Sequence, residues 1–148
     1  MLSQGISEKL FNSKKVRLFQ YPQIILKTME EIWKIIPDYP NYKVSNLGRV
    51  RSLNYNRTGK VQNMKLGTYP NGYKMVDLKK DKKRKAHLVH RLVAKAFIPN
   101  PDQLCEVNHK DENKTNNNVK NLEWCTNKYN LNYGTRNKRA AKTMGKKV

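Results

Sequence analysis

The stretch from Glu106 to Asn130 constrains this chain more than any other. His109 follows a short run of apolar and acidic residues, a loop dense in asparagine comes next, and a short amphipathic segment leads to Asn130. The stretch therefore offers one base that titrates near neutral pH and several neutral oxygen donors, in a chain otherwise crowded with cations. A single base beside hard oxygen ligands suits metal-assisted cleavage of a phosphodiester, which is the first hypothesis for this chain.

The charge balance predicts a polyanionic partner. The net charge is +20, from 31 Lys and Arg against 11 Asp and Glu, and nucleic acid is the commonest partner of such a chain. A disordered basic protein is disfavoured, because 37% of the residues are hydrophobic and they include eight Tyr and two Trp. Five acids lie within residues 102–123, where they either screen an ion or a base or simply cap turns.

Length and cysteine usage narrow the class of protein. At 148 residues the chain fits one domain, or one domain with a small module. Cys105 and Cys125 lack the CxxC spacing of a cysteine zinc site, and their usage fits a reducing cytoplasm. No apolar run approaches the roughly 20 residues that span a bilayer, and the first residues lack the core of a signal peptide. We expect a cytoplasmic protein that does not contact a membrane.

A first β-hairpin is predicted between Tyr42 and Leu53. Two alternating segments flank Asn46-Leu47-Gly48, where Gly48 takes the position that needs a positive φ. Apolar side chains (Tyr42, Val44, Val50) occupy one face. The other face is basic and either contacts phosphates or is solvated, with Lys43, Arg49 and Arg51 as its cations.

A second pair of strands is expected at residues 73–78 and 86–89, after a turn at Pro70-Asn71-Gly72. Between them we expect a basic hairpin tip over residues 79–85, which either contacts phosphates or serves as a solubilising loop. Its cations are Lys79, Lys80, Lys82, Lys83, Arg84 and Lys85.

A short helix is predicted over residues 90–97, ended by Pro99 and Pro101. The two histidines near its start, His87 and His90, are interpreted as structural groups with satisfied hydrogen bonds rather than as metal ligands. Further on, Thr126 can cap a final short helix that carries Asn130. The residues after that helix form a basic tail without acids, which we expect to be disordered until bound.

Together these segments resemble an HNH endonuclease. The resemblance rests on residues 90–94 (HRLVA), 107–111 (VNHKD) and 121–124 (NLEW), followed by Asn130. It is most similar to the phage group of intron-encoded or free-standing homing and nicking enzymes. Residues 32–50 resemble the small DNA-binding module that often precedes this nuclease domain, so the likeness extends over about residues 30–133.

The resemblance implies an α+β fold in four parts. Residues 1–28 would be an N-terminal extension to which we assign no function, and residues 29–80 a small antiparallel β-sheet module that binds DNA. Residues 81–133 would be a ββα-metal (HNH) nuclease domain, in which two strands with a long loop and a helix clasp one ion. Residues 134–148 would be a flexible basic tail.

The resemblance also implies roles for single residues. His109 would be the general base that deprotonates the attacking water, and Asn121 would hold the strand of His109 across the loop. Asn108 and Asn130 would bind one divalent ion, Mg²⁺ or Mn²⁺. The partner would be double-stranded DNA, bound by a monomer. DNA contacts would come from Lys43, Arg49, Arg51, Lys79, Lys80, Lys82, Lys83, Arg84, Lys85, Lys114, Arg136, Lys138 and Arg139.

Two residues depart from the family pattern. Close relatives often carry Asp where this chain has Asn108, and a neutral ligand should weaken metal binding, so Asn108→Asp is expected to strengthen it. Glu112 replaces a residue that is commonly Gly, which would cost roughly 1–2 kcal/mol if the backbone there is left-handed. A DNA-binding protein with a decayed nuclease centre is therefore the alternative function. An RNA-binding basic protein is a third, because phosphate contacts do not choose the sugar.

Overall fold

The computed structural model describes residues 30–135, 137–138 and 141–142. The chain divides into two units, Met1–Glu31 and Ile32–Val148, and the fold below is that of the second. The predicted N-terminal extension, residues 1–28, lies outside the described residues. Within the described part of the tail, residues 137–138 and 141–142 are helical.

The first sheet contains the hairpin that the alternation predicts. Its four antiparallel strands are β1 (Trp33–Ile36), β2 (Tyr39–Ser45), β3 (Val50–Ser52) and β4 (Gln62–Asn63), in that order across the sheet. A short 3₁₀ helix, η1 (Tyr55–Arg57), connects β3 to β4. Val44 pairs with Val50 and both are buried, while Gly48 in the turn has φ +82°, so the predicted hairpin and glycine conformation are confirmed.

The second sheet differs from the expectation. It comprises β5 (Gly67–Thr68), β6 (Lys74–Lys80) and β7 (Lys83–Leu88). The expected basic hairpin is present, but the predicted strand ends at residues 78 and 86 are wrong. Both strands continue into the basic run, leaving only Asp81 and Lys82 as the turn. These two residues have φ of 51° and 63°, as a two-residue type I′ turn requires, and such a turn matches the twist of long paired strands.

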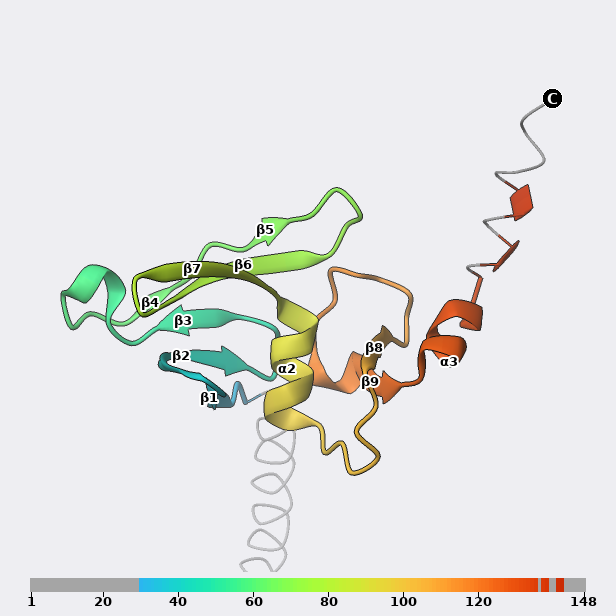
Figure 1. Cartoon of the computed structure of the whole chain (residues 1–148), viewed down its shortest axis with the longest axis horizontal. Helices are drawn as coiled ribbons and strands as arrows, with labels where there is room; N and C mark the ends of the chain where they lie inside the picture. The colour runs from blue at the N-terminus through green and yellow to red at the C-terminus, as the bar shows by residue number, and fades with distance from the viewer. Residues whose placement is uncertain (1–29, 136, 139–140, 143–148) are drawn as a thin grey trace, which may run out of the picture. The chain divides into compact units, whose positions relative to one another are not determined.

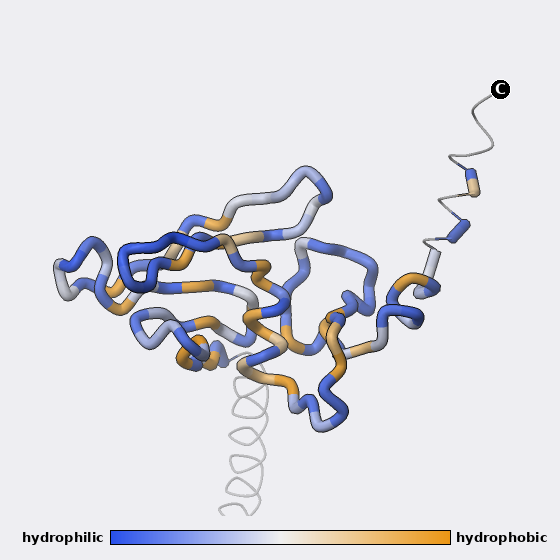
Figure 2. The backbone as a smooth tube through the Cα atoms, viewed as in Figure 1, coloured by the Kyte–Doolittle hydropathy of each residue, from blue (hydrophilic) through white to orange (hydrophobic). Residues whose placement is uncertain are grey.

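Helix α2 (Val89–Phe97) packs against strands of all three sheets (Figure 1). It begins one residue before the predicted start, because Val89 is fully buried and belongs to its apolar face with Leu92, Val93 and Ala94. Figure 2 shows hydrophobic and hydrophilic residues alternating along α2, and it shows that the end of the β6–β7 hairpin is strongly hydrophilic.

The third sheet is a hairpin with a long loop. Strand β8 (Glu106–His109) pairs antiparallel with β9 (Leu122–Cys125), and a short 3₁₀ helix, η2 (Val119–Asn121), closes the loop between them. Helix α3 (Asn127–Asn132) follows, and Thr126 caps it as predicted by accepting a hydrogen bond of 3.1 Å from the Tyr129 N–H. This is the ββα order of the α+β fold that the sequence implied.

One hydrophobic core extends over the described sheets. It joins Val44 of β2, Leu78 of β6, Leu92 of α2 and Val107 of β8, among other buried residues. The β6–β7 hairpin also crosses the predicted domain boundary at residue 80, and that division stays a prediction. Among the described residues, no helix has the length and apolar character needed to cross a bilayer.

Candidate active site

A cavity of about 340 Å³ gathers three of the four residues that the sequence predicts to act in catalysis or metal binding. Asn108 and His109 reach it from the end of β8, and Asn130 reaches it from α3. The antiparallel pairing of β8 with β9 and the short connection to α3 bring these elements together. The remaining lining residues are Asn71, Tyr73, Val107, Glu112, Lys114 and Tyr133.

His109 is the last residue of β8 and is only 5% exposed, so it does not lie in the polar loop itself. Its Nε2 lies 3.0 Å from Oδ1 of Asn117. The Asn117 amide nitrogen faces the carbonyl of Thr115, at 3.4 Å, which fixes the amide oxygen toward His109. An amide oxygen only accepts, so Nε2 carries the proton and neutral His109 keeps Nδ1 as its basic nitrogen.

The surroundings of His109 favour its neutral form. Burial lowers its pKa below the ordinary 6.5, and the nearby Lys114 acts in the same direction. The hydrogen bond with Asn117 and the charge of Asp111 oppose this shift without cancelling it. A neutral imidazole with a free Nδ1 can accept a proton from water.

A second histidine packs beside the first. The His90 ring lies 4.9 Å from that of His109 and 5.0 Å from that of Tyr73, measured between centroids. Burial, followed by the charges of His109 and Arg91, lowers the pKa of His90 to about 3.

The sequence interpretation of the two helix-proximal histidines is half correct. His87 is satisfied, because its Nε2 lies 2.9 Å from the Tyr39 hydroxyl. His90 is not, since its buried Nδ1 has no hydrogen-bond partner among the described residues. This unpaired nitrogen belongs to a ring that packs beside Tyr73 and His109. The sequence could not indicate that environment.

The two asparagines expected to bind metal differ in their restraint. Asn108 is 6% exposed, and its Nδ2 donates a hydrogen bond of 2.8 Å to Oε1 of Glu123. Asn130 is half-buried on α3. The described part of the chain has no group of three or more His, Cys, Asp or Glu that could hold a metal. The cavity lining offers amide side chains at Asn71, Asn108 and Asn130 and one carboxylate, Glu112. Such a donor set fits a hard ion such as Mg²⁺ better than Zn²⁺.

Asn121 lies outside the cavity and ties the two ends of the loop together. Its Oδ1 accepts from the Asp111 N–H at 3.0 Å, and its Nδ2 donates to Oδ1 of Asp111 at 2.8 Å. The same Nδ2 donates to the carbonyl of Asn116, and the Asn121 carbonyl accepts from the Lys110 N–H. These bonds join the residues just after His109 to η2.

The acids around the loop serve as turn caps and anchors. Asp111 accepts hydrogen bonds from Asn116, Asn113 and Asn121, and the bond from Asn116 is the first cause of its lowered pKa. Glu106 forms an ion pair of 2.8 Å with Arg91. The sequence left two roles open for these acids, to screen an ion or a base or to cap turns. The hydrogen bonds of Asp111 are those of a turn cap.

The backbone of Glu112 is left-handed, with φ +59°. This is the conformation considered above for a residue that replaces a glycine. Its carboxylate accepts hydrogen bonds from the N–H and the hydroxyl of Thr135, at 2.7 and 2.8 Å. A Cβ at Gly134 would collide with that carboxylate. Glu112 thus fastens the chain that follows α3 beside the cavity, a contact that a glycine could not make.

The first hairpin supports the His109 loop from outside the cavity. The Val119 N–H donates to the Asn46 carbonyl at 2.8 Å. At Gly48 an added Cβ would stand 2.6 Å from Cβ of Asn117, the residue that holds His109. The close approach explains why the turn needs glycine for space as well as for its positive φ.

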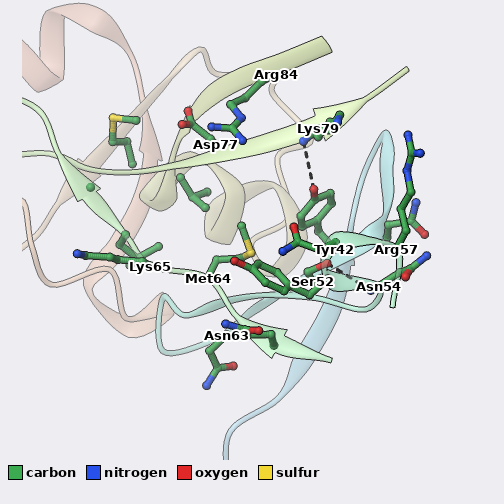
Figure 3. A pocket seen from close by; sticks show the side chains of 18 of the residues that line it. Tyr42, Ser52, Asn54, Arg57, Asn63, Met64, Lys65, Asp77, Lys79 and Arg84 are labelled. Atoms are coloured by element: carbon green, nitrogen blue, oxygen red, sulfur yellow. Dashed lines mark hydrogen bonds between the residues drawn. The ribbon is translucent and has the colours of Figure 1, made fainter. Parts of the chain in front are cut away.

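A larger groove of about 930 Å³ lies between the first and second sheets (Figure 3). Strands β6 and β7 form one wall with Asp77, Lys79 and Arg84, and the opposite wall comes from β2, β3, η1 and β4. A hydrogen bond of 3.3 Å from the Lys79 N–H to the Tyr42 hydroxyl joins the walls. Cations and amides dominate its polar lining: Lys79, Lys82, Arg84, Arg57, Lys65, Asn41, Asn54, Asn56, Gln62 and Asn63.

The cations expected to contact DNA fall in different places. All six of the run at residues 79–85 are exposed, and strand pairing puts Lys79 and Arg84 on the groove face and Lys80 and Lys83 on the other. Arg49 is exposed and Lys43 half-buried.

The other predicted DNA contacts have mixed positions. Arg51 lies over the Trp33 ring at 4.1 Å. Lys114 lines the cavity around His109 and donates to the Asn71 carbonyl at 2.9 Å. Lys138 is exposed, whereas Arg136 and Arg139 lie outside the described residues.

Sequence reasoning missed several residues at this site: Asn117, Tyr73, Tyr133 and Glu123. Asn117 is one of three consecutive asparagines, and nothing in the sequence distinguishes it from the others. Glu123 carried a usable signal, because an antiparallel pairing of the two segments puts it directly opposite Asn108.

Comparison with known proteins gives matches to two parts of the chain. A family model described as HNH endonuclease matches residues 87–132, and one described as NUMOD4 motif matches residues 31–79. The chain is 42% identical over 105 residues to an HNH endonuclease of Acanthamoeba polyphaga mimivirus, which covers 71% of this chain and 30% of that protein. It is also 42% identical over 100 residues to DNA endonuclease I-HmuI of Bacillus phage SP01, covering 67% of this chain and 55% of the phage protein.

The solved structure described as DNA binding and cleavage by the HNH homing endonuclease I-HmuI is similar to this chain in fold. The TM-score is 0.59 at 35% sequence identity, and the match covers 77% of this chain and 68% of that one. The chain spans about half or less of the two relatives matched by sequence. The family models, the relatives and the ββα arrangement around His109 agree: the chain belongs to the HNH endonuclease family.

Proposed function

We propose that this chain is a divalent-metal-dependent endonuclease that hydrolyses phosphodiester bonds in double-stranded DNA by nicking or cutting it. The observation that carries the proposal is one cavity lined by a buried, neutral-favouring His109 and by the side chains of Asn108 and Asn130. The I-HmuI relative is named a DNA endonuclease, which agrees with this chemistry.

In the proposed reaction, His109 acts as the general base. Its Nδ1 takes a proton from a water molecule as the water oxygen attacks phosphorus, and the bond from phosphorus to the 3′ oxygen breaks. The Nε2–H bond to Asn117 holds the ring in the tautomer that leaves Nδ1 free. Asn121 acts at a distance from the reaction, by holding the segment after His109 against η2.

Asn108 and Asn130 would hold one divalent ion, Mg²⁺ or Mn²⁺, through their amide oxygens. A bound ion would supply charge stabilisation for the phosphate and the departing 3′ oxygen. Two neutral ligands leave most of the coordination shell to water and phosphate oxygens, which suits Mg²⁺ because it retains several waters. Lys114 lines the same cavity, and its positive charge would favour a phosphate bound there.

DNA would be held by the cationic surfaces outside the cavity. The groove between the first two sheets presents Lys79, Lys82 and Arg84 together with a row of amide side chains. Cations suit the phosphate backbone, and amides can hydrogen-bond base edges. Exposed Arg49 and Lys138 would add contacts to the DNA backbone. The protein would act as a monomer.

Supercoiled plasmid tests the proposal directly. With Mg²⁺ the purified protein should convert supercoiled DNA to the open circular or linear form, and EDTA should abolish the conversion. Conversion that persists in EDTA would refute metal dependence. Binding of plasmid without conversion at any Mg²⁺ or Mn²⁺ concentration would instead favour a decayed nuclease centre.

A further inference from the structure

Glu123 is a carboxylate beside the proposed metal ligands that the mechanism above does not use. It stands on β9 directly opposite Asn108 on β8. Its Oε1 accepts a hydrogen bond of 2.8 Å from Nδ2 of Asn108, and the Tyr129 hydroxyl on α3 lies 3.4 Å from the same oxygen. One carboxylate oxygen therefore meets both elements that carry the proposed ligands.

This contact decides which end of the Asn108 amide faces the cavity. A carboxylate accepts but cannot donate, so the group that meets Glu123 must be the NH₂ and not the oxygen. The Asn108 side chain lines the cavity, and its Oδ1 has no hydrogen-bond partner among the residues the structure describes. The amide oxygen thus remains available as an acceptor.

We infer that Glu123 is a positioning residue for the metal site, which holds Asn108 with its oxygen presented to the ion and links β8 to the helix of Asn130 through Tyr129. The inference rests on the proposed metal role of Asn108. Partners that orient a metal ligand in this way typically change metal affinity by about 10- to 100-fold when they are replaced.

The same contact changes the expected effect of Asn108→Asp. The single substitution removes the N–H donor and brings two carboxylates to hydrogen-bonding distance, where their charges repel each other in the metal-free protein. Adding Glu123→Gln restores the pair in reverse, because the Gln amide can donate to the carboxylate introduced on β8 while the total charge of the pair stays the same. The exchanged pair Asp–Gln should therefore keep the hydrogen bond and the total charge of the pair Asn–Glu.

The orientation can be measured without metal or DNA. In the metal-free wild type, one side-chain N–H of Asn108 should resonate downfield and exchange slowly with solvent, because it is bound to a carboxylate. Asn108→Ala, which removes the signal, assigns it. Glu123→Gln should move the signal upfield and speed its exchange. Glu106→Gln is the matched control, since it removes one negative charge from the same hairpin at a residue that pairs with Arg91.

The effect on the ion can be measured with Mn²⁺, by paramagnetic broadening of protein resonances in a titration. Glu123→Gln should weaken Mn²⁺ binding about tenfold, and Glu106→Gln should leave it unchanged. The double variant Asn108→Asp/Glu123→Gln should bind Mn²⁺ at least as tightly as the wild type. An unchanged Asn108 signal and unchanged Mn²⁺ affinity in Glu123→Gln would overturn the inference.

The two proposals fail in different ways. If Asn108→Ala binds Mn²⁺ as the wild type does, Asn108 is not a ligand and the metal assignment falls, whatever Glu123 does. If Asn108→Ala loses Mn²⁺ binding but Glu123→Gln matches the wild type in both measurements, the metal assignment stands and only the positioning role of Glu123 is refuted.

Discussion

At the scale of single residues, the chemistry of the cavity depends on which nitrogen of His109 carries its proton. Asn117 fixes the proton on Nε2, and burial keeps the ring neutral. A neutral ring with a free Nδ1 is the form that can act as a base, so the protein stabilises the reactive form before substrate binds. Neither effect requires Asn117 or the residues that bury His109 to take part in the reaction themselves.

The pH dependence of nicking should report this environment. A general base works in its neutral form, and the pKa of His109 is lowered from 6.5, so the neutral form persists below pH 6.5. A divalent ion nearby would lower that pKa further. The acid limb of the single-turnover nicking rate should therefore have its midpoint below pH 6.5. A midpoint above that value would contradict the environment described for His109.

His90 should make the fold sensitive to acid. Its folded-state pKa of about 3 lies below the ordinary 6.5, so the unfolded chain binds a proton first as the pH falls. The contribution is fully present above pH 6.5 and is lost progressively towards pH 3. At about pH 5 the loss should be about 2 kcal/mol of unfolding free energy. Chemical denaturation at neutral pH and at that acid pH measures it.

Replacement of His90 provides the control for that measurement. His90→Leu removes the titrating group and should shrink the difference between the two pH values, even where its overall stability is lower. An equal pH dependence in wild type and variant would assign the acid sensitivity to other groups, such as His109 and Asp111.

At the scale of elements, the turn of the first hairpin is a support for the catalytic loop. Gly48 approaches Asn117 so closely that Cβ atoms would stand 2.6 Å apart, and Asn117 in turn holds His109. The module matched by the NUMOD4 model therefore contacts the loop of the nuclease module directly. Changes in the turn should reach the reaction without touching the cavity.

Gly48→Ala tests this connection, with Gly59→Ala as its matched control. Both glycines have positive φ, +82° and +73°, so both substitutions should cost roughly 1–2 kcal/mol of backbone strain. Only Gly48 has a neighbour, since nothing lies within 4 Å of a Cβ at Gly59. Gly48→Ala should therefore lower both stability and nicking rate, while Gly59→Ala lowers stability alone. Equal nicking rates in the two folded variants would refute the support.

Sequence patterns predicted the elements that depend on local periodicity. The alternation around Gly48 and the cap at Thr126 depend on neighbouring residues, and both are confirmed. The strand ends beside the basic run at residues 79–85 were predicted wrongly, because the run of charges hid the type I′ turn at Asp81 and Lys82 that lets both strands continue.

The candidate site was only partly predictable from sequence. Asn108, His109 and Asn130 were found through the family resemblance, and the structure lines one cavity with them. Asn117 and Tyr73 could not be found, because their contacts with His109 depend on how the loop and the chain before β6 pack in three dimensions. The roles of the three expected residues stay predictions.

At the scale of the whole molecule, the +20 net charge should make DNA binding strongly dependent on salt. If about six phosphate contacts form, the logarithm of the affinity should fall with the logarithm of salt concentration with a slope of about −5. A slope near zero in a titration from low to moderate salt would contradict an electrostatic interface.

The two faces of the β6–β7 hairpin allow that interface to be located. Lys79→Gln/Arg84→Gln removes two cations from the groove face, and Lys80→Gln/Lys83→Gln removes two from the opposite face. The net charge change is equal. If the groove holds DNA, the first pair should reduce the slope by about 2 and the second by less. Equal slopes would mean that the groove is not the preferred binding face.

The nicking rate of His109→Ala, compared with the wild type on supercoiled plasmid at saturating Mg²⁺, tests the central claim most directly. Loss of the general base should reduce the rate by about 10²–10⁴-fold. Plasmid affinity should stay within a few-fold, because one neutral imidazole adds little to a surface of +20. A purified, folded His109→Ala protein that nicks at the wild-type rate would contradict the account.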